Sequence, residues 1–193
     1  MVSLLGGKWT TYRQMGEDTV EKVLASHPSL RRTTVYPRSI SSSVHLLGSY
    51  TSKSFESDGE EKDKGLHDFI KPYTDFLVQE YNIDPDSARI LVRCYGSLSV
   101  QVAELGRKTN TLEVIHPSSS YLKVQVLYAI RNEFSVKTTD VLFRRLGISF
   151  VDQNHCSNLV KNVVDIMGDE LKWNQSKKEK EIATAMKNIN TML

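Results

Sequence analysis

The fold of this chain is decided near its start, by the stretch Leu4-Leu5-Gly6-Gly7-Lys8-Trp9-Thr10-Thr11-Tyr12-Arg13. The apolar residues before the glycines predict a β-strand, and the two glycines allow a tight turn. Thr10 or Thr11 is expected to cap the helix that follows. The stretch therefore predicts a corner between a strand and a helix, with the terminal strand and turn occupying residues 1–8.

A corner of this kind is a candidate binding surface. The first N–H groups of a helix have no partner inside the helix, and they lie at the positive end of its dipole. Lys8 adds a full positive charge at the same place, so the corner favours an anionic or electron-rich ligand. The alternative is an ordinary loop with a solvated lysine. The candidate site residues are Gly6, Gly7, Lys8, Trp9, Thr10 and Thr11.

The longer string, with Met15, Glu17, Asp18 and Val20, resembles the segment of FAD-dependent glycerol-3-phosphate dehydrogenases in which the flavin domain ends and the C-terminal helical domain begins. Further stretches match that family in the same order along almost the whole chain. They are Leu46-Leu47-Gly48, Tyr95-Gly96, His116-Pro117, Tyr121, Tyr128–Glu133, Asp140–Arg145 and Ile166–Trp173.

The resemblance implies an all-α fold. Residues 9–193 are expected to form a C-terminal bundle of about six to eight helices, preceded by the last strand of a flavin domain that lies outside this chain. Residues 56–64, with the sequence ESDGEEKDK, are expected to form a charged surface loop.

The resemblance also implies a function. Family members oxidise sn-glycerol 3-phosphate to dihydroxyacetone phosphate, transfer a hydride to FAD and pass electrons to a membrane quinone, or to oxygen in the oxidase branch. Gly6 and Gly7 would let the backbone approach the flavin, the N–H groups from Trp9 to Thr11 would stabilise negative charge on it, and Lys8 would lie near flavin or substrate.

The implied partners are the N-terminal FAD domain of the same protein, glycerol 3-phosphate and a quinone. The full enzyme is expected to associate peripherally with the mitochondrial inner membrane or the bacterial cytoplasmic membrane. No catalytic residue is expected in this chain, which has no phosphate-binding fingerprint such as G-x-G-x-x-G. The isolated chain is therefore expected to be soluble and inactive.

Composition excludes other classes of protein. A net charge of +2 argues against a nucleic-acid-binding protein, and no apolar run approaches the length of a membrane span, about 20 residues. Cys94 and Cys156 are too few for a disulfide framework. His45, His67, His116 and His155 are scattered, so no metal site is expected.

One competing hypothesis comes from another class of protein. The chain could be a self-sufficient helical module that binds a protein or a nucleic acid through Arg131, Arg144 and Arg145. The favoured interpretation is that these arginines pair with Glu133, with Asp140 or with the flavin domain.

Periodicity and end signals predict the individual helices. Residues 120–134 alternate as a strand would, but their length and their all-round apolar character favour a buried helix. The other predicted helices are 10–26; one from about 70, with Pro72 in its first turn; one capped by Asp84-Pro85 and ended by Gly96; 97–106, ended by Gly106; one capped by Thr138 or Thr139 and ended by Gly147; 154–167, ended by Gly168; and one opened by a capping box at Ser176–Glu179. An extended crossing or weak hairpin is expected over 31–50.

Overall fold

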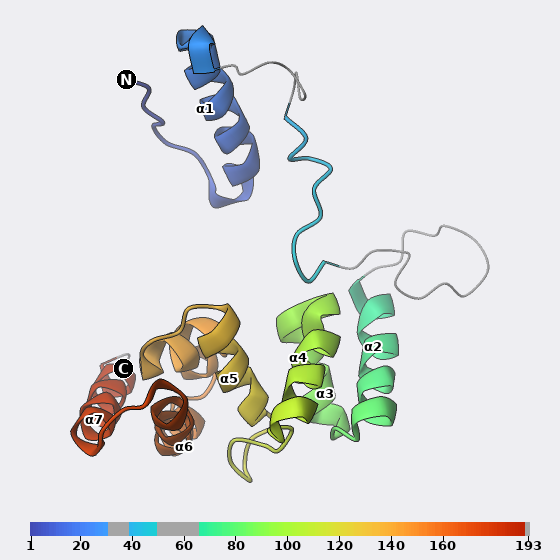
Figure 1. The fold of residues 1–193 in the computed structure, drawn as a ribbon, viewed down its shortest axis with the longest axis vertical. Helices are drawn as coiled ribbons and strands as arrows, with labels where there is room; N and C mark the ends of the chain where they lie inside the picture. The colour runs from blue at the N-terminus through green and yellow to red at the C-terminus, as the bar shows by residue number, and fades with distance from the viewer. Residues whose placement is uncertain (31–38, 50–65, 192–193) are drawn as a thin grey trace. The chain divides into compact units, whose positions relative to one another are not determined.

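The computed structural model describes residues 1–30, 39–49 and 66–191, and every regular element in these ranges is a helix (Figure 1). Their one β-type pairing is an isolated bridge between Val114 and Leu122. The all-α prediction is confirmed. Backbone contacts divide the chain into two compact units, Met1–Leu46 and Leu47–Leu193. The boundary predicted after residue 8 stays a prediction, and the charged loop 56–64 lies outside the described residues.

The first unit contains η1 (Trp9–Thr11), α1 (Tyr12–Ser26) and η2 (Pro28–Leu30), and none of these elements has a buried residue. The strand predicted before Gly6 does not form in this chain. A strand needs a neighbour for its N–H and C=O groups, and the described ranges contain no other strand with which it could pair. Residues 39–49 contain turns and no hairpin, so the hairpin alternative is wrong for the described part of 31–50, and the extended crossing stays a prediction.

The second unit begins with α2 (Leu66–Tyr81), α3 (Pro85–Tyr95), η4 (Gly96–Leu98) and α4 (Ser99–Thr109). The predicted cap of α3 is confirmed, because the Asp84 carboxylate accepts hydrogen bonds from the N–H groups of Asp86 and Ser87, both at 3.1 Å. Gly96 ends α3 with a φ of 57°, as predicted. Pro72 was expected in the first turn of α2, but the helix begins one turn earlier and holds it in the interior.

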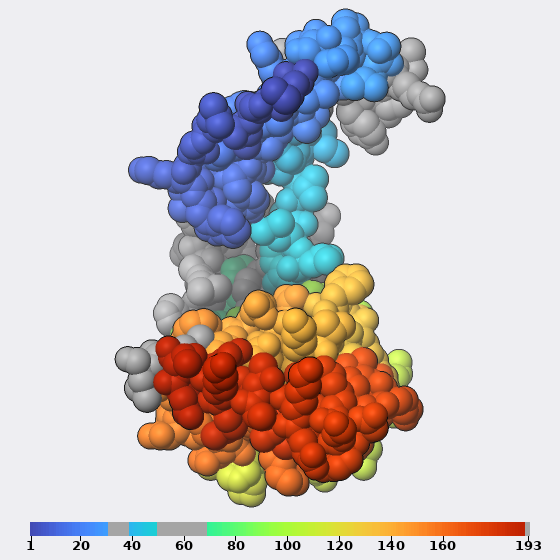
Figure 2. Space-filling model, turned by 90° about the vertical axis from the view of Figure 1, so that its left-hand side faces the viewer, coloured from blue at the N-terminus to red at the C-terminus, as the bar shows by residue number. Residues whose placement is uncertain are grey.

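The remaining elements are α5 (Lys123–Asn132), the π-helical turn η5 (Asp140–Arg145), η6 (Ile148–Phe150), α6 (Gln153–Leu171) and α7 (Gln175–Asn190). Figure 2 shows α6 and α7, orange to red, side by side over one face of this unit.

Helix α5 is central, as predicted, because it supplies both hydrophobic clusters of the second unit. Val124 and Tyr128 pack with the residues of α2, α3 and α4, whereas Val126 and Ala129 pack with those of α6 and α7. The helix is shorter than predicted, since it begins at Lys123.

Two glycines predicted to end helices lie inside them instead. Helix α4 continues past Gly106 to a left-handed Asn110, and α6 continues past Gly168 to a left-handed Lys172. Both glycines are buried at close contacts. A Cβ on Gly106 would overlap the side chain of Leu112, and one on Gly168 would overlap the stem of Lys178. Their role is therefore close packing rather than helix termination.

Two predicted caps are also wrong. The carboxylate of Asp140, not Thr138 or Thr139, accepts from the backbone before η5, at 3.1 Å from the N–H of Val136 and 3.0 Å from that of Lys137. The side chain of Asn174, not of Ser176, caps α7 through the N–H of Lys177 at 2.9 Å.

Glu181 of α7 ties the loop before η5 to the C-terminal helix. Its buried carboxylate accepts a 2.9 Å hydrogen bond from the N–H of Thr138 and a 2.6 Å bond from the ammonium of Lys177. Burial alone would raise the pKa of Glu181, but these two donors outweigh it and leave the pKa below its usual value. The buried N–H of Thr138 is thereby satisfied.

Candidate functional site

The corner at Gly6 and Gly7 has the backbone conformation that the sequence predicts. Gly6 has a φ of 79° and Gly7 a φ of 117°, values that residues with a Cβ rarely adopt. The N–H of Thr11 donates to the carbonyl of Lys8 at 3.0 Å, which starts the helical turn η1. The N–H groups that precede Thr11 therefore lie at the open end of the helix.

The threonines do not cap the helix. The Thr11 hydroxyl donates to the Lys8 carbonyl at 2.9 Å, and no side-chain cap is formed at η1 or α1. The prediction that Thr10 or Thr11 accepts from the first turn is therefore wrong. As a result, no side chain of the described residues accepts a hydrogen bond from the N–H groups at this helix start, and these groups stay available to a ligand.

Gly7 also lies close to the helix. A Cβ placed on Gly7 would overlap the thioether of Met15, whereas one on Gly6 would meet nothing within 4 Å. The six candidate residues from Gly6 to Thr11 are all exposed. Lys8 forms no ion pair with the described residues. The structure therefore brings together a tight turn, free backbone donors and an unpaired ammonium group.

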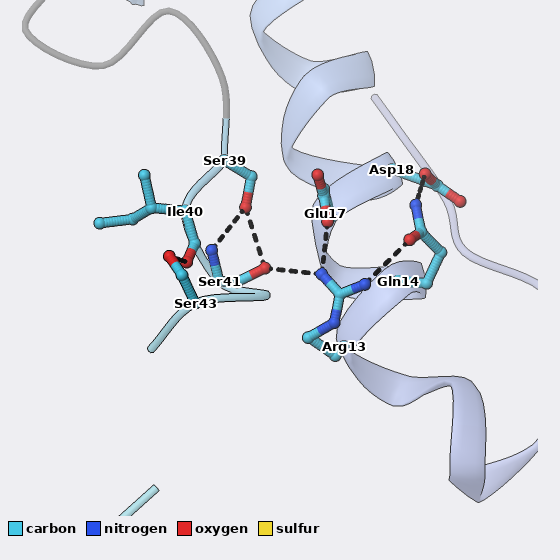
Figure 3. A network of polar contacts seen from close by, with 8 residues as sticks. All are labelled: Arg13, Gln14, Glu17, Asp18, Ser39, Ile40, Ser41 and Ser43. Carbon is cyan, nitrogen blue, oxygen red and sulfur yellow. Dashed lines mark hydrogen bonds and ion pairs between the residues drawn. The ribbon is translucent and has the colours of Figure 1, made fainter. Parts of the chain in front are cut away.

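Sequence reasoning missed the side chain that stabilises the first unit (Figure 3). Arg13 donates to Glu17 at 2.6 Å and to the hydroxyl of Ser41 at 2.9 Å, so it connects α1 to residues 39–43. Its pairing with Glu17 is the usual i, i+4 arrangement and could have been predicted. The contact with Ser41, 28 residues away, could not.

The three arginines of the competing hypothesis are paired within the second unit. Arg131 donates two hydrogen bonds to Glu170, at 2.7 and 2.9 Å, and Arg144 pairs with Asp140 at 2.6 Å. Arg145 donates to the backbone carbonyl of Glu133 at 2.7 Å, and the carboxylate of Glu133 lies 3.8 Å from the Arg145 guanidinium group. The prediction that these arginines pair with Glu133 and Asp140 is confirmed for Arg144 and Arg145. Arg131 pairs with a residue that was not foreseen.

Glu133 follows α5 and is partly buried beside Tyr95, Tyr128 and Cys94. One of its carboxylate oxygens is buried without a hydrogen-bond partner in the described part of the chain. Burial raises the pKa of Glu133, and the more distant charge of Arg145 only partly offsets this. Glu133 also raises the pKa of Cys94, after the effect of desolvation.

A pH dependence of stability follows from Glu133. The native state holds this proton to a higher pH than the unfolded chain does, so Glu133 lowers the free energy of unfolding as pH rises through its raised pKa. Glu133→Gln removes the charge and should stabilise the chain by on the order of 1 kcal/mol at neutral pH, and by less near pH 4. Urea unfolding at both pH values measures the difference. Glu80→Gln, at an exposed position of α2, is the control, and an equal gain in both variants would contradict the expectation.

The described residues contain no cluster of three or more His, Cys, Asp or Glu side chains that could hold a metal ion. None of the helices described here has the length and apolar character needed to cross a membrane.

Comparison with known proteins assigns the family. The sequence pattern of the C-terminal domain of alpha-glycerophosphate oxidase matches residues 39–178. This chain belongs to that family. The chain is 25% identical over 193 residues to the probable mitochondrial glycerol-3-phosphate dehydrogenase of Dictyostelium discoideum, covering 100% of this chain and 27% of that protein. It is 29% identical over 192 residues to the mitochondrial glycerol-3-phosphate dehydrogenase of Bos taurus, covering 97% of this chain and 23% of that protein.

The chain spans about a quarter of the length of the curated relatives it matches. The family pattern lies mostly in the second unit, whereas the alignment with the Dictyostelium protein covers the whole chain, including the corner at its start.

Two stretches that carry the family resemblance meet in the second unit. Gly48 and Gly96, here called the glycine clasp, have φ values of 84° and 57° and approach each other so closely that a Cβ on Gly96 would overlap the Gly48 carbonyl. Ser97 donates its N–H to Gly48 at 3.0 Å and its hydroxyl to the carbonyl of Ser49 at 2.9 Å. The clasp fixes residues 47–49 against the end of α3.

Proposed function

We propose that this chain is the C-terminal part of an FAD-dependent glycerol-3-phosphate dehydrogenase, which oxidises sn-glycerol 3-phosphate to dihydroxyacetone phosphate and passes electrons through FAD to a quinone. The family match over residues 39–178 is the observation that carries this proposal. The names of the relatives from Dictyostelium and cattle support both the substrate and a mitochondrial location.

The corner at Gly6 to Thr11 fits a flavin. FAD, when bound, supplies the hydride acceptor. The positive φ angles of Gly6 and Gly7 and their lack of side chains permit a planar ligand to approach the backbone closely. The N–H groups at the start of η1 would donate to a developing negative charge, and the positive end of the helix would stabilise it. Lys8 would place its ammonium group beside the flavin or the phosphate of the substrate.

The rest of the protein would cover the first unit. Helix α1 of the first unit has no buried residue, and the side chains of Trp9 and Leu5 are 90% and 91% exposed. Exposed apolar side chains of this size on one unit are typical of a surface that contacts another protein domain. We propose that residues 1–8 join the last strand of the N-terminal FAD domain and that α1 packs on that domain. The second unit would then serve as a helical cap whose role is interdomain contact.

The full-length protein is the material for the test of this function. It should bind FAD and reduce a dye acceptor when given sn-glycerol 3-phosphate, whereas the isolated 193-residue chain should fold but show neither property. The visible flavin spectrum and the rate of dye reduction measure the two expectations. A full-length protein that leaves glycerol 3-phosphate unoxidised, or a yellow isolated chain, would overturn the proposal. Added quinone in place of the dye tests the electron acceptor, and association with anionic vesicles tests the peripheral membrane location.

A further inference from the structure

A groove of about 950 Å³ runs between α2 and α3 in the second unit. Pro85, Arg89 and Arg93 line its α3 wall, one helical turn apart. Residues four apart on a helix lie on the same face, about 6 Å from each other, so the two guanidinium groups can reach the same ligand. The groove shares no residue with the corner at Gly6 to Thr11.

The two arginines are available for a ligand. Both are exposed, and neither forms an ion pair within the described part of the chain. This distinguishes them from Arg107, Arg131, Arg144 and Arg145, each of which has a carboxylate partner within 4 Å. Sequence reasoning missed Arg89 and Arg93, although their spacing of four residues was a visible signal.

The opposite wall of the groove is formed by α2 and carries no unpaired charge among its described lining residues. Ile70 and Val78 of α2 supply apolar surface, and Lys71 lies beside Asp75, with which it pairs. The carboxylate of Asp75 is thus neutralised by Lys71, and no carboxylate of the described residues pairs with Arg89 or Arg93. The α2 wall therefore combines the apolar side chains of Ile70 and Val78 with polar groups that carry no net charge, whereas the α3 wall is cationic.

We propose that this groove binds a small organic anion that carries a phosphate group. The phosphate lies between Arg89 and Arg93, whose planar guanidinium groups donate paired hydrogen bonds to phosphate oxygens. The carbon part of the ligand packs against Ile70 and Val78. The volume of the groove exceeds that of a phosphate ion alone, which favours an organic phosphate. This site goes beyond the proposed function, because it lies in the helical cap rather than at the flavin.

Titration calorimetry on the 193-residue chain tests the site with sn-glycerol 3-phosphate and inorganic phosphate as probes. At least one probe should bind with a dissociation constant of about 1 mM or tighter. The double variant Arg89→Gln/Arg93→Gln should weaken binding about 10-fold or more. Arg107→Gln/Arg144→Gln removes the same number of charges from other surfaces and should change binding less than about twofold. Equal losses in the two double variants would indicate general attraction of anions and overturn the site.

A second readout uses Cys94, which is exposed and lines the groove. A bound anion should slow alkylation of this thiol, because it blocks access and disfavours the thiolate. Cys156 is buried and serves as the internal control. Protection of Cys94 that disappears in Arg89→Gln/Arg93→Gln supports the site. Unchanged alkylation at saturating probe would contradict it.

The phosphate could belong to a free metabolite or to a lipid headgroup, and a vesicle arm separates these sources. Vesicles of phosphatidylcholine with phosphatidic acid are compared with vesicles of phosphatidylcholine alone. Binding only to the former, lost in Arg89→Gln/Arg93→Gln, assigns the phosphate to a lipid. Binding of the soluble probe alone assigns it to a metabolite. Absence of binding in both arms overturns the proposal, whatever the activity of the full-length enzyme.

Discussion

Lys8→Met in the full-length enzyme is expected to lower kcat/KM for glycerol 3-phosphate by about 100-fold, equivalent to about 3 kcal/mol of transition-state stabilisation. Lys8 is exposed and has no ion-pair partner among the described residues, so its charge is free to act on a ligand. A preorganised charge beside developing negative charge is worth far more than one in bulk water.

Folding should hardly respond to the same change. Methionine keeps most of the aliphatic stem, and an exposed, unpaired lysine contributes under about 1 kcal/mol to stability. The measurements are kcat/KM and the melting temperature of the same preparation. Lys22→Met, at an exposed lysine within α1, is the matched control and should retain wild-type activity. A loss below about threefold at Lys8, with unchanged melting, would assign Lys8 to the surface and leave only the backbone of the corner as functional.

Gly96→Ala is expected to destabilise the second unit by about 3 kcal/mol. Two effects combine at this position. Gly96 has a φ of 57° and a ψ of −131°, a conformation that residues with a Cβ avoid, and the new methyl group would overlap the Gly48 carbonyl. The glycine clasp would have to open, which would remove the hydrogen bonds from Ser97 to Gly48 and Ser49.

Gly147→Ala separates these two effects. Gly147 has a φ of 64°, but a Cβ there would meet nothing within 4 Å, so only the backbone penalty of about 1 kcal/mol applies. Urea unfolding followed by far-ultraviolet circular dichroism gives both values. The clasp has no special role in stability if the two substitutions cost the same.

The helices whose signals are local were predicted well. Asp84 followed by Pro85 marks the start of α3 because a carboxylate cap and a first-turn proline act within four residues. Helix α5 was recognised by its length and all-round apolar character although its residues alternate as a strand would. The corner glycines were predicted for the same reason, since a tight turn requires positive φ at Gly6 and Gly7.

The wrong predictions arose where a residue of the right type had a competitor or a packing role that its type does not reveal. Ser176 had the residue type and spacing of a cap, but the helix begins earlier, at a capping Asn174. Gly168 resembled a helix stop, but it lies inside α6 with the stem of Lys178 packed across it. Residue type indicates that a glycine is needed, and only the packing shows whether conformation or space is the reason.

The sequence by itself determined the all-α class, most of the helices, the turn at Gly6 and Gly7 and the family, because these depend on local periodicity, on turn chemistry and on motifs read in order. Only the tertiary structure decided which groups meet. It paired Glu181 with Thr138, joined Gly48 to Gly96, gave Arg131 a carboxylate and, among residues 1–30, 39–49 and 66–191, left Arg89 and Arg93 without one. Such contacts arise from the packing of segments far apart in the chain, which no local pattern encodes.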